Sequence, residues 1–331
     1  MPAKAERELQ SDQNSAMNRK TSSETKRIII TDEKHGLPYS KGLTASAVMS
    51  TGLPPLRSYF VAKQVEEQLR RKGIYALTVE QLRAIVYEVL ETQSGREYAD
   101  KYLKWQALVE LDLPLIIMIG GTTGVGKSTI ATEIAHRLGI TRIVATDAIR
   151  EVMRALFSEE LMPTLYSSSF DAWQSLRPIA GNGENPVIAG FVEQTRAVVV
   201  GVRAIVDRAI REGTHLVLEG VHIVPGMVDF RHDNALIAPL VIGVEDEELH
   251  RSHFYIREKE TDGSRAFERY RANFAHIRSI GRFIEESARD QGVPLIFSHQ
   301  LDATVSSVLE NITNQIILPQ ENMKAAPIRG R

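Results

Sequence analysis

The sequence of 331 residues contains no cysteine. Disulfide bonds, thiolate metal sites and a cysteine nucleophile are therefore excluded. No apolar run approaches the roughly 18 residues that a membrane-spanning helix needs. The N-terminus lacks the apolar core of about 7–15 residues that a signal peptide contains. We therefore expect a cytoplasmic protein that does not bind a membrane.

Neither sign of charge is in marked excess, because 40 Lys and Arg residues face 42 Asp and Glu residues, for a net charge of −2. This balance gives no overall attraction to a nucleic acid or an anionic membrane. The expected partners are small molecules, and no feature sets an oligomeric state. Hydrophobic residues make up 43% of the chain and charged residues 25%, which is ordinary for a globular protein long enough for two domains.

Residues 115–129 read L-I-I-M-I-G-G-T-T-G-V-G-K-S-T, and the rest of the chain is organised around them. The apolar run predicts a buried strand, residues 121–128 fit the P-loop pattern G-x-x-x-x-G-K-[ST], and residues 129–138 have apolar positions at helical spacing. The alternative, a glycine-rich turn that binds nothing, does not explain why strand, loop and helix follow in this order.

Glycine at three loop positions lets the backbone wrap a polyphosphate, because glycine adopts positive φ and has no Cβ. We expect the Lys127 ammonium to bridge the β- and γ-phosphates of ATP and the Ser128 hydroxyl to bind Mg²⁺. The residues expected to bind the nucleotide are Gly121, Thr122, Thr123, Gly124, Val125, Gly126, Lys127, Ser128 and Thr129.

The N-terminal third divides into a tail and a small domain. Residues 1–26 are polar and predict a disordered tail. Residues 27–112 predict a short strand and several helices, one of them begun by a capping box of Thr78 and Gln81. This arrangement resembles an ATP-cone, a small regulatory nucleotide-binding module. Residues 30–41 lack the Lys-Arg-Asp-Gly cluster of better-known cones, so no binding residue is carried over, and a helical cap that only packs remains the alternative.

From residue 113 to residue 318 strands and helices alternate. This pattern predicts a second domain of the α/β class, with a five-stranded parallel sheet and helices on both faces. A polar tail is expected over residues 319–331.

The helix after the second expected strand carries Asp147, Arg150 and Arg154 on one face. Ligands in folds of this class bind beyond the carboxyl ends of the strands, where Asp147 lies. An acid followed by two bases suits a hydroxyl on an anionic substrate. The alternative is that Asp147 only caps the helix and that the arginines are solvated.

Two further positions follow the strand at residues 215–220. Glu219 occupies the Walker-B position, where a carboxylate holds Mg²⁺ directly or through water. His222 is a candidate for substrate contact at the edge of the sheet. Residues 161–185, rich in Pro, Ser, Gly and Asn, are expected to form a substrate lid, with a plain linker as the alternative.

Residues 245–282 contain seven arginines and eight carboxylates. A solvated, salt-bridged helical hairpin would explain this composition. Kinases with a P-loop nevertheless carry an arginine-bearing lid at this point in the chain, which neutralises charge in the transition state. We expect Arg265 and Arg269 to be the catalytic lid arginines, with Arg257 as a further candidate.

The sequence contains neither Asn-Lys-x-Asp nor Asp-x-x-Gly, so a GTPase is not expected, and the remaining pattern favours a kinase for a small molecule. The chain resembles the 2-phosphoglycerate kinase family over residues 27–317. The motifs that carry the resemblance are I-G-G-T-T-G-V-G-K-S-T at residues 119–129, T-D-A-I-R-E-V-M-R at 146–154, residues 166–173, and L-E-G-V-H-I-V-P-G at 218–226.

The resemblance implies a P-loop kinase fold preceded by a cone-like domain, and an enzyme that uses ATP and Mg²⁺. It implies a phosphorylated carboxylic acid as acceptor, with 2-phosphoglycerate converted to 2,3-bisphosphoglycerate. Two alternatives stay open: a kinase for another phosphorylated sugar acid or polyol phosphate, and a nucleotide-gated regulatory protein that binds ATP without chemistry.

Overall fold

The computed structural model describes residues 27–31, 36–109, 113–176, 185–229, 231–260 and 267–325. The tail expected over residues 1–26, the boundary expected at residue 112 and Arg265 lie outside these ranges. Within them, no helix is both long enough and apolar enough to cross a membrane.

The larger sheet has five strands, all parallel, in the order β5-β6-β4-β7-β8. The predicted parallel sheet is therefore confirmed. Its central strand is buried at every residue, as expected of a continuous apolar run covered on both faces. The strands are β4 (Leu115–Gly120), β5 (Ile143–Ala145), β6 (Leu216–Glu219), β7 (Leu236–Gly243) and β8 (Leu295–Phe297).

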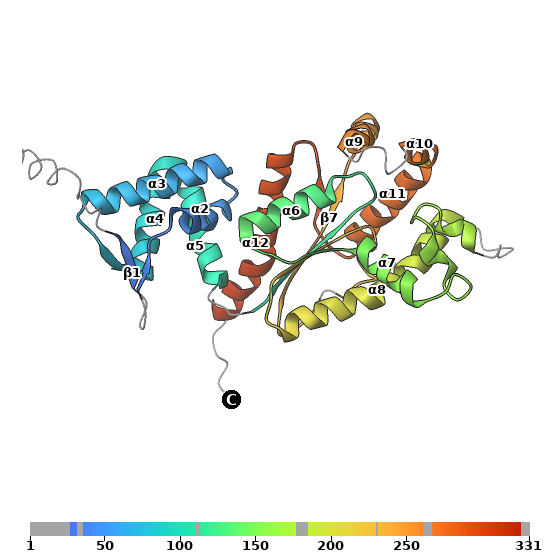
Figure 1. The fold of residues 1–331 in the computed structure, drawn as a ribbon, viewed down its shortest axis with the longest axis horizontal. Helices are drawn as coiled ribbons and strands as arrows, with labels where there is room; N and C mark the ends of the chain where they lie inside the picture. The colour runs from blue at the N-terminus through green and yellow to red at the C-terminus, as the bar shows by residue number, and fades with distance from the viewer. Residues whose placement is uncertain are drawn as a thin grey trace, which may run out of the picture.

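Helices cover both faces of this sheet (Figure 1). Alternate side chains of β4 separate the two layers, since Ile117 and Ile119 pack with α6 and α12, whereas Ile116 and Met118 pack with α7 and α8. The helices of the first layer are α6 (Lys127–Leu138) and α12 (Leu301–Ala325), and those of the second are α7 (Thr146–Leu156), α8 (Pro186–Arg211) and α11 (Phe274–Asp290).

The range 245–282, which is expected to form a lid, includes part of a core helix. Residues in this range form α9 (Glu247–Glu260) and α10 (Phe267–Ala272), but α11 belongs to the core. Phe274, Ile277 and Ile280 of α11 are buried on one face of that helix. Arginines between these positions conceal the apolar periodicity when the range is judged by composition alone. At the other end of the chain, the tail expected from residue 319 remains helical up to Ala325, although it begins with a proline.

The N-terminal unit contains a three-stranded sheet in the order β2-β1-β3, packed with four helices. The predicted capping box of Thr78 and Gln81 is confirmed at the start of α4. The elements are β1 (Ile29–Thr31), β2 (Gly36–Pro38), α2 (Lys41–Met49), α3 (Pro55–Arg71), β3 (Ala76–Thr78), α4 (Val79–Ser94) and α5 (Arg96–Val109).

Helix α5 belongs to the hydrophobic cores of both parts. Ala99 and Tyr102 pack within the N-terminal unit, whereas Trp105 and Leu108 pack in the core formed by the large sheet, α6 and α12. The apolar packing of the large sheet therefore extends to the N-terminal side of the boundary expected at residue 112.

A polar contact supports the same junction, where α6 and α12 lie beside the N-terminal unit (Figure 1). The Gly52 carbonyl accepts hydrogen bonds from Arg137 Nη1 of α6 and from Ser306 Oγ of α12, each at 3.3 Å. The Arg137 side chain is 1% exposed and also pairs with Glu133 at 2.7 Å and with Asp302 at 3.1 Å. A buried guanidinium needs such partners, because an unpaired one would be strongly destabilising.

We expect Trp105→Ala to lower the free energy of unfolding by about 3–5 kcal/mol, since it removes a large buried side chain from the core of the large sheet. Urea unfolding followed by circular dichroism measures this change. Leu103→Ala on the same helix is the control, because Leu103 is 45% exposed and surface substitutions usually change stability by within about 0.5 kcal/mol. Equal effects of the two substitutions would contradict the assignment of Trp105 to that core.

Candidate functional site

A cavity of about 1250 Å³ opens at the carboxyl ends of the parallel strands. The P-loop follows β4, helix α7 follows β5, and Glu219 ends β6, so the topology brings these segments to one edge of the sheet. The segment at residues 168–170 and helix α10 complete the walls. The volume suffices for a nucleotide and a small acid together, since single-ligand pockets typically measure about 300–1,000 Å³.

Six of the nine expected nucleotide-binding residues line this cavity: Thr123, Gly124, Gly126, Lys127, Ser128 and Thr129. The other three face elsewhere. Thr122 Oγ1 donates to the Ile277 carbonyl at 2.9 Å, Val125 is buried in the core, and Gly121 does not reach the cavity surface. These three shape the loop from behind and do not line the cavity.

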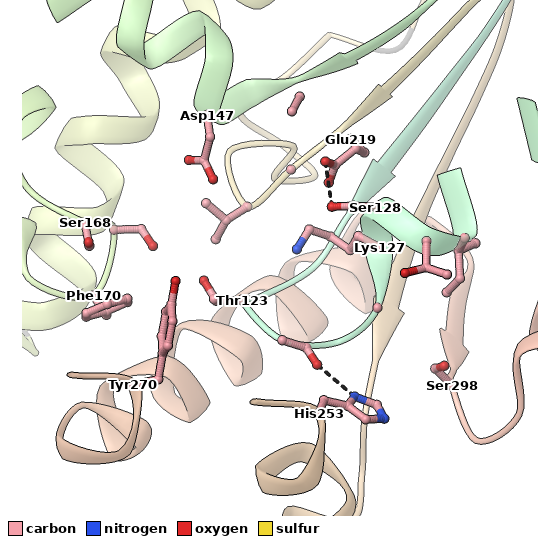
Figure 2. A pocket seen from close by; sticks show the side chains of 18 of the residues that line it. Thr123, Lys127, Ser128, Asp147, Ser168, Phe170, Glu219, His253, Tyr270 and Ser298 are labelled. Carbon is pink, nitrogen blue, oxygen red and sulfur yellow. Dashed lines mark hydrogen bonds between the residues drawn. The ribbon is translucent and has the colours of Figure 1, made fainter. Parts of the chain in front are cut away.

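Lys127 is 8% exposed, and its ammonium donates to the Thr122 carbonyl at 2.8 Å. In Figure 2 the ammonium faces the open centre of the cavity, between Asp147 and Glu219. Burial lowers the pKa of Lys127, while the carboxylates of Glu219 and Asp147 act in the opposite direction. An anion in the cavity would therefore stabilise the charged form of a lysine that the fold has already removed from water.

Ser128 and Glu219 form an oxygen-rich pair beside this lysine (Figure 2). Ser128 Oγ donates to Glu219 Oε1 at 2.9 Å, and Glu219 is 7% exposed. Oxygen donors of this kind suit Mg²⁺, which takes few protein ligands and completes its shell with water and phosphate oxygens. No cluster of three or more His, Cys, Asp or Glu side chains able to hold a metal occurs among the residues that the structure describes.

Asp147 and two arginines lie at the other end of the cavity. Asp147 stands at the start of α7, and its side chain is 66% exposed. Arg150 Nε lies 3.8 Å from Asp147 Oδ1, and within the described part of the chain this buried nitrogen makes no hydrogen bond. Arg269 of α10 pairs with Asp171 Oδ2 at 2.6 Å and lies over the Phe170 ring at 5.6 Å. The structure thus brings Lys127 together with these groups in one cavity.

Two expected substrate residues do not line the cavity. Arg154 hydrogen-bonds both oxygens of Glu151 at 2.9 Å and covers the Tyr166 ring at 4.9 Å. His222 is fully buried and bonds to Thr146 and Gln194. Helical spacing could not show that Arg154 pairs with Glu151 and Tyr166 instead of lining the cavity. The position of His222 after β6 did not show that its side chain points into the protein. The Arg257 side chain is outside the part of the chain described.

Helix α9 supplies two histidines that the sequence analysis missed. His250 shares a hydrogen bond at 2.8 Å with the Thr123 carbonyl, and His253 shares one at 2.8 Å with the Gly124 carbonyl (Figure 2). Phe254, next in the chain, packs so closely that a Cβ on Gly124 would lie 2.5 Å from its ring. Spacings of three and four between these residues place them on one helix face. That spacing was the available signal, but the surrounding charges concealed it.

The cavity has two ends with different chemistry. Backbone amides, a lysine and an oxygen pair at the P-loop end can hold a polyphosphate and a cation. A carboxylate and two guanidinium groups at the α7 end can orient a hydroxyl on a small anion. The Lys127 ammonium at the P-loop end and the Asp147 carboxylate at the α7 end face the same open space (Figure 2).

No family model matches the chain. A protein from Methanopyrus kandleri named 2-phosphoglycerate kinase is 39% identical over 295 residues, which cover 88% of this chain and 89% of that protein. Another of the same name from Pyrococcus furiosus is 39% identical over 292 residues, covering 88% and 94% of the two chains. Among solved structures, a gluconokinase from Sinorhizobium meliloti aligns with 65% of this chain and 99% of its own at 15% identity and a TM-score of 0.35, too low for an argument.

The contact of His250 with the P-loop generates a prediction about pH. The pKa of His250 is lowered to about 4, mainly by burial and also by the nearby basic side chains, against the hydrogen bond to the Thr123 carbonyl. As the pH falls, the unfolded chain takes up a proton near its usual pKa of about 6.5, before the folded protein does. Stability should therefore fall between about pH 6.5 and about pH 4.

We expect His250→Gln, which keeps an amide donor but cannot titrate, to remove about 2 kcal/mol of the stability difference between about pH 7 and about pH 5. Urea unfolding at the two pH values measures it. His136→Gln is the control, because His136 is exposed on α6. An unchanged pH dependence in the His250 variant would show that His250 is not held neutral by the fold.

Proposed function

The chain belongs to the 2-phosphoglycerate kinase family, and we propose that it transfers the γ-phosphoryl group of ATP to 2-phosphoglycerate, forming 2,3-bisphosphoglycerate and ADP. One observation carries the proposal: a single cavity joins the P-loop to a carboxylate and two guanidinium groups. A small-molecule kinase needs both ends, because the nucleotide and the acceptor must meet in line.

At the P-loop end, backbone amides and the Lys127 ammonium hold the phosphates of ATP. The donor set of Ser128 and Glu219 fits Mg²⁺, and these two residues would hold it. When bound, the ion neutralises charge on the β- and γ-phosphate oxygens. Thr129, Ser298 and His299 also line the cavity, and Ser298 lies beyond Ser128 on the side away from Asp147, where the rest of the nucleotide would fit (Figure 2).

At the α7 end, Asp147 receives the proton of the acceptor hydroxyl. The hydroxyl oxygen on carbon 3 of the acceptor attacks the γ-phosphorus, a new P–O bond forms, and the bond from that phosphorus to the bridging oxygen of ADP breaks. Asp147 suits this role because its carboxylate faces the same open space as Lys127 (Figure 2). A positioned base of this kind contributes roughly 10²–10⁴-fold to a rate.

Arg150 and Arg269 would recognise the two anionic groups of the acceptor. Arg150 lines the cavity, and its buried Nε lies 3.8 Å from Asp147 Oδ1 without a hydrogen bond to any described residue. Arg269 reaches the cavity while paired with Asp171, so an acceptor anion would share or replace that carboxylate. Each charge-assisted contact contributes about 1.5–3 kcal/mol, which favours a doubly anionic acceptor over a singly anionic one.

We expect Asp147→Asn to lower kcat by at least about a hundredfold, because the amide cannot accept the hydroxyl proton. The affinity for ATP, measured by calorimetry, should change little, since Asp147 stands at the opposite end of the cavity from the nucleotide site. A kcat close to that of the wild-type enzyme would leave Asp147 as an acidic residue in the first turn of α7 without a role in proton transfer.

An acceptor panel tests the proposed substrate. We expect ADP release to depend on 2-phosphoglycerate, with kcat/KM at least about a hundredfold above that for glycerate, which lacks one anionic group. Other phosphorylated sugar acids and polyol phosphates complete the panel. Equal kcat/KM for glycerate and 2-phosphoglycerate would contradict the acceptor, and ATP binding without acceptor-dependent ADP release would contradict the kinase.

A further inference from the structure

Behind the acceptor end of the cavity lies a set of buried polar side chains that touch neither the P-loop nor the cavity surface. Thr146, Gln194 and His222 are each 0% exposed. They come from the start of α7, the middle of α8 and the segment after β6. Buried polar groups are costly unless they are hydrogen-bonded, so their partners decide what they do.

The hydrogen bonds among them have only one consistent direction. Gln194 Nε2 donates to the carbonyls of Thr164 at 2.5 Å and Ser167 at 3.0 Å, which fixes the orientation of its amide group. Gln194 Oε1 must then accept from His222 Nε2, at 3.0 Å. His222 Nδ1 is left as an acceptor for the Thr146 hydroxyl, at 2.9 Å. Burial favours the neutral imidazole, whose proton is then on Nε2.

Burial agrees with this assignment, because it lowers the pKa of His222 to about 4. The Phe191 ring stacks on the imidazole, with centroids 6.4 Å apart and planes at 28°, and closes one side against water. The fit is also tight around Thr146, since a Cβ on Gly220 would lie 1.9 Å from Thr146 Oγ1. Only glycine at residue 220 leaves room for the threonine to reach the histidine.

These bonds form a closed ring that begins and ends on α7. The Ser167 carbonyl, which accepts from Gln194, also accepts from Arg150 Nη1. Thr146 and Arg150 are four residues apart and lie on one face of the helix. The ring thus runs from α7 through His222, Gln194 and Ser167 and back to α7. Its members hold one another.

We propose that Thr146, His222 and Gln194 are positioning residues that fix the acceptor end of the cavity. The ring ties two walls together: α7, which carries Asp147 and Arg150, and the segment that carries Ser168 and Ser169 at the cavity surface. Neither wall is a strand of the sheet, so neither has its place fixed by backbone pairing. The inference rests on the proposed function, because it assigns that end to the acceptor.

The P-loop end does not depend on this ring. His250 and His253 of α9 brace the loop from the other side, and Ser128 contacts Glu219 directly. Loss of the ring should therefore weaken the use of the acceptor and leave the affinity for the nucleotide unchanged. A displacement of about 1 Å at a reacting group can lower a rate by about a hundredfold.

The experiment compares Thr146→Val, which replaces the hydroxyl by a methyl group, with Thr146→Ser, which keeps the hydroxyl. His222→Phe removes both imidazole bonds while keeping an aromatic ring beside Phe191. The matched control is His215→Phe, because His215 lies at the opposite end of β6 and accepts one hydrogen bond, from the Leu115 amide at 2.9 Å. Steady-state kinetics give kcat and the acceptor KM, and calorimetry gives the Kd for ATP.

We expect Thr146→Val and His222→Phe to lower kcat/KM for 2-phosphoglycerate by roughly ten- to a hundredfold. The Kd for ATP should stay within about twofold, Thr146→Ser should restore most of the activity, and His215→Phe should change neither constant by more than about twofold. Equal losses of ATP and acceptor binding, or no loss of either, would overturn the proposal.

Amide hydrogen exchange, measured without an acceptor, separates this inference from the proposed function. His222→Phe should speed exchange at residues 146–150 and 164–170 at least about tenfold over wild type, and His215→Phe should not. Unchanged exchange would contradict the proposal that the ring holds the two walls in place. A wild-type enzyme with no activity on any acceptor would contradict the proposed function, while the exchange result would still decide whether the ring holds them.

Discussion

A loop that turns its amides toward a phosphate must turn some of its carbonyls away from it, and those carbonyls need donors. This constraint organises much of the structure around the P-loop. The Thr122 carbonyl accepts from the Lys127 ammonium, while the carbonyls of Thr123 and Gly124 meet His250 and His253 of α9. Contacts within the protein therefore shape the loop, and α9 packs along its outer side.

The same constraint explains why the two ends of the cavity are built differently. At the P-loop end, the backbone would make the contacts with the proposed nucleotide, and His250 and His253 satisfy the loop carbonyls from the other side. At the α7 end, side chains make the contacts, and a ring of buried side chains fixes the helix that carries them. Aromatic packing connects the ends, because Phe254 lies against Gly124 and stacks on Tyr270 of α10 with centroids 5.0 Å apart. A shift of α10 would therefore displace Phe254, which lies against Gly124 of the P-loop.

Sequence patterns predicted the parts of this fold that depend on local rules. The apolar run before the P-loop, the capping box at Thr78 and the alternation after residue 113 each reflect backbone geometry, and the structure contains the corresponding elements. The shared cavity of Lys127, Ser128, Asp147 and Glu219 followed from strand ends meeting at one edge, although their roles stay predictions. His222, Arg154 and His250 could not be placed, because the depth of a side chain depends on segments far away in the sequence. Composition also misled where arginines covered the apolar stripe of α11.

The junction at Gly52 has a consequence for how the chain is made. Its carbonyl accepts from Arg137, which lies 85 residues later, and from Ser306, which lies 254 residues later. At a synthesis rate of about 5–20 residues per second, roughly ten to fifty seconds separate Gly52 from Ser306 on the ribosome. From their own synthesis until α12 is made, Arg137 lacks Asp302, and the face of α5 that bears Trp105 lacks α12. The first part of the chain to be translated is thus completed by the last helix to emerge, and a nascent chain stalled before α12 would display a guanidinium and a tryptophan that the finished protein buries.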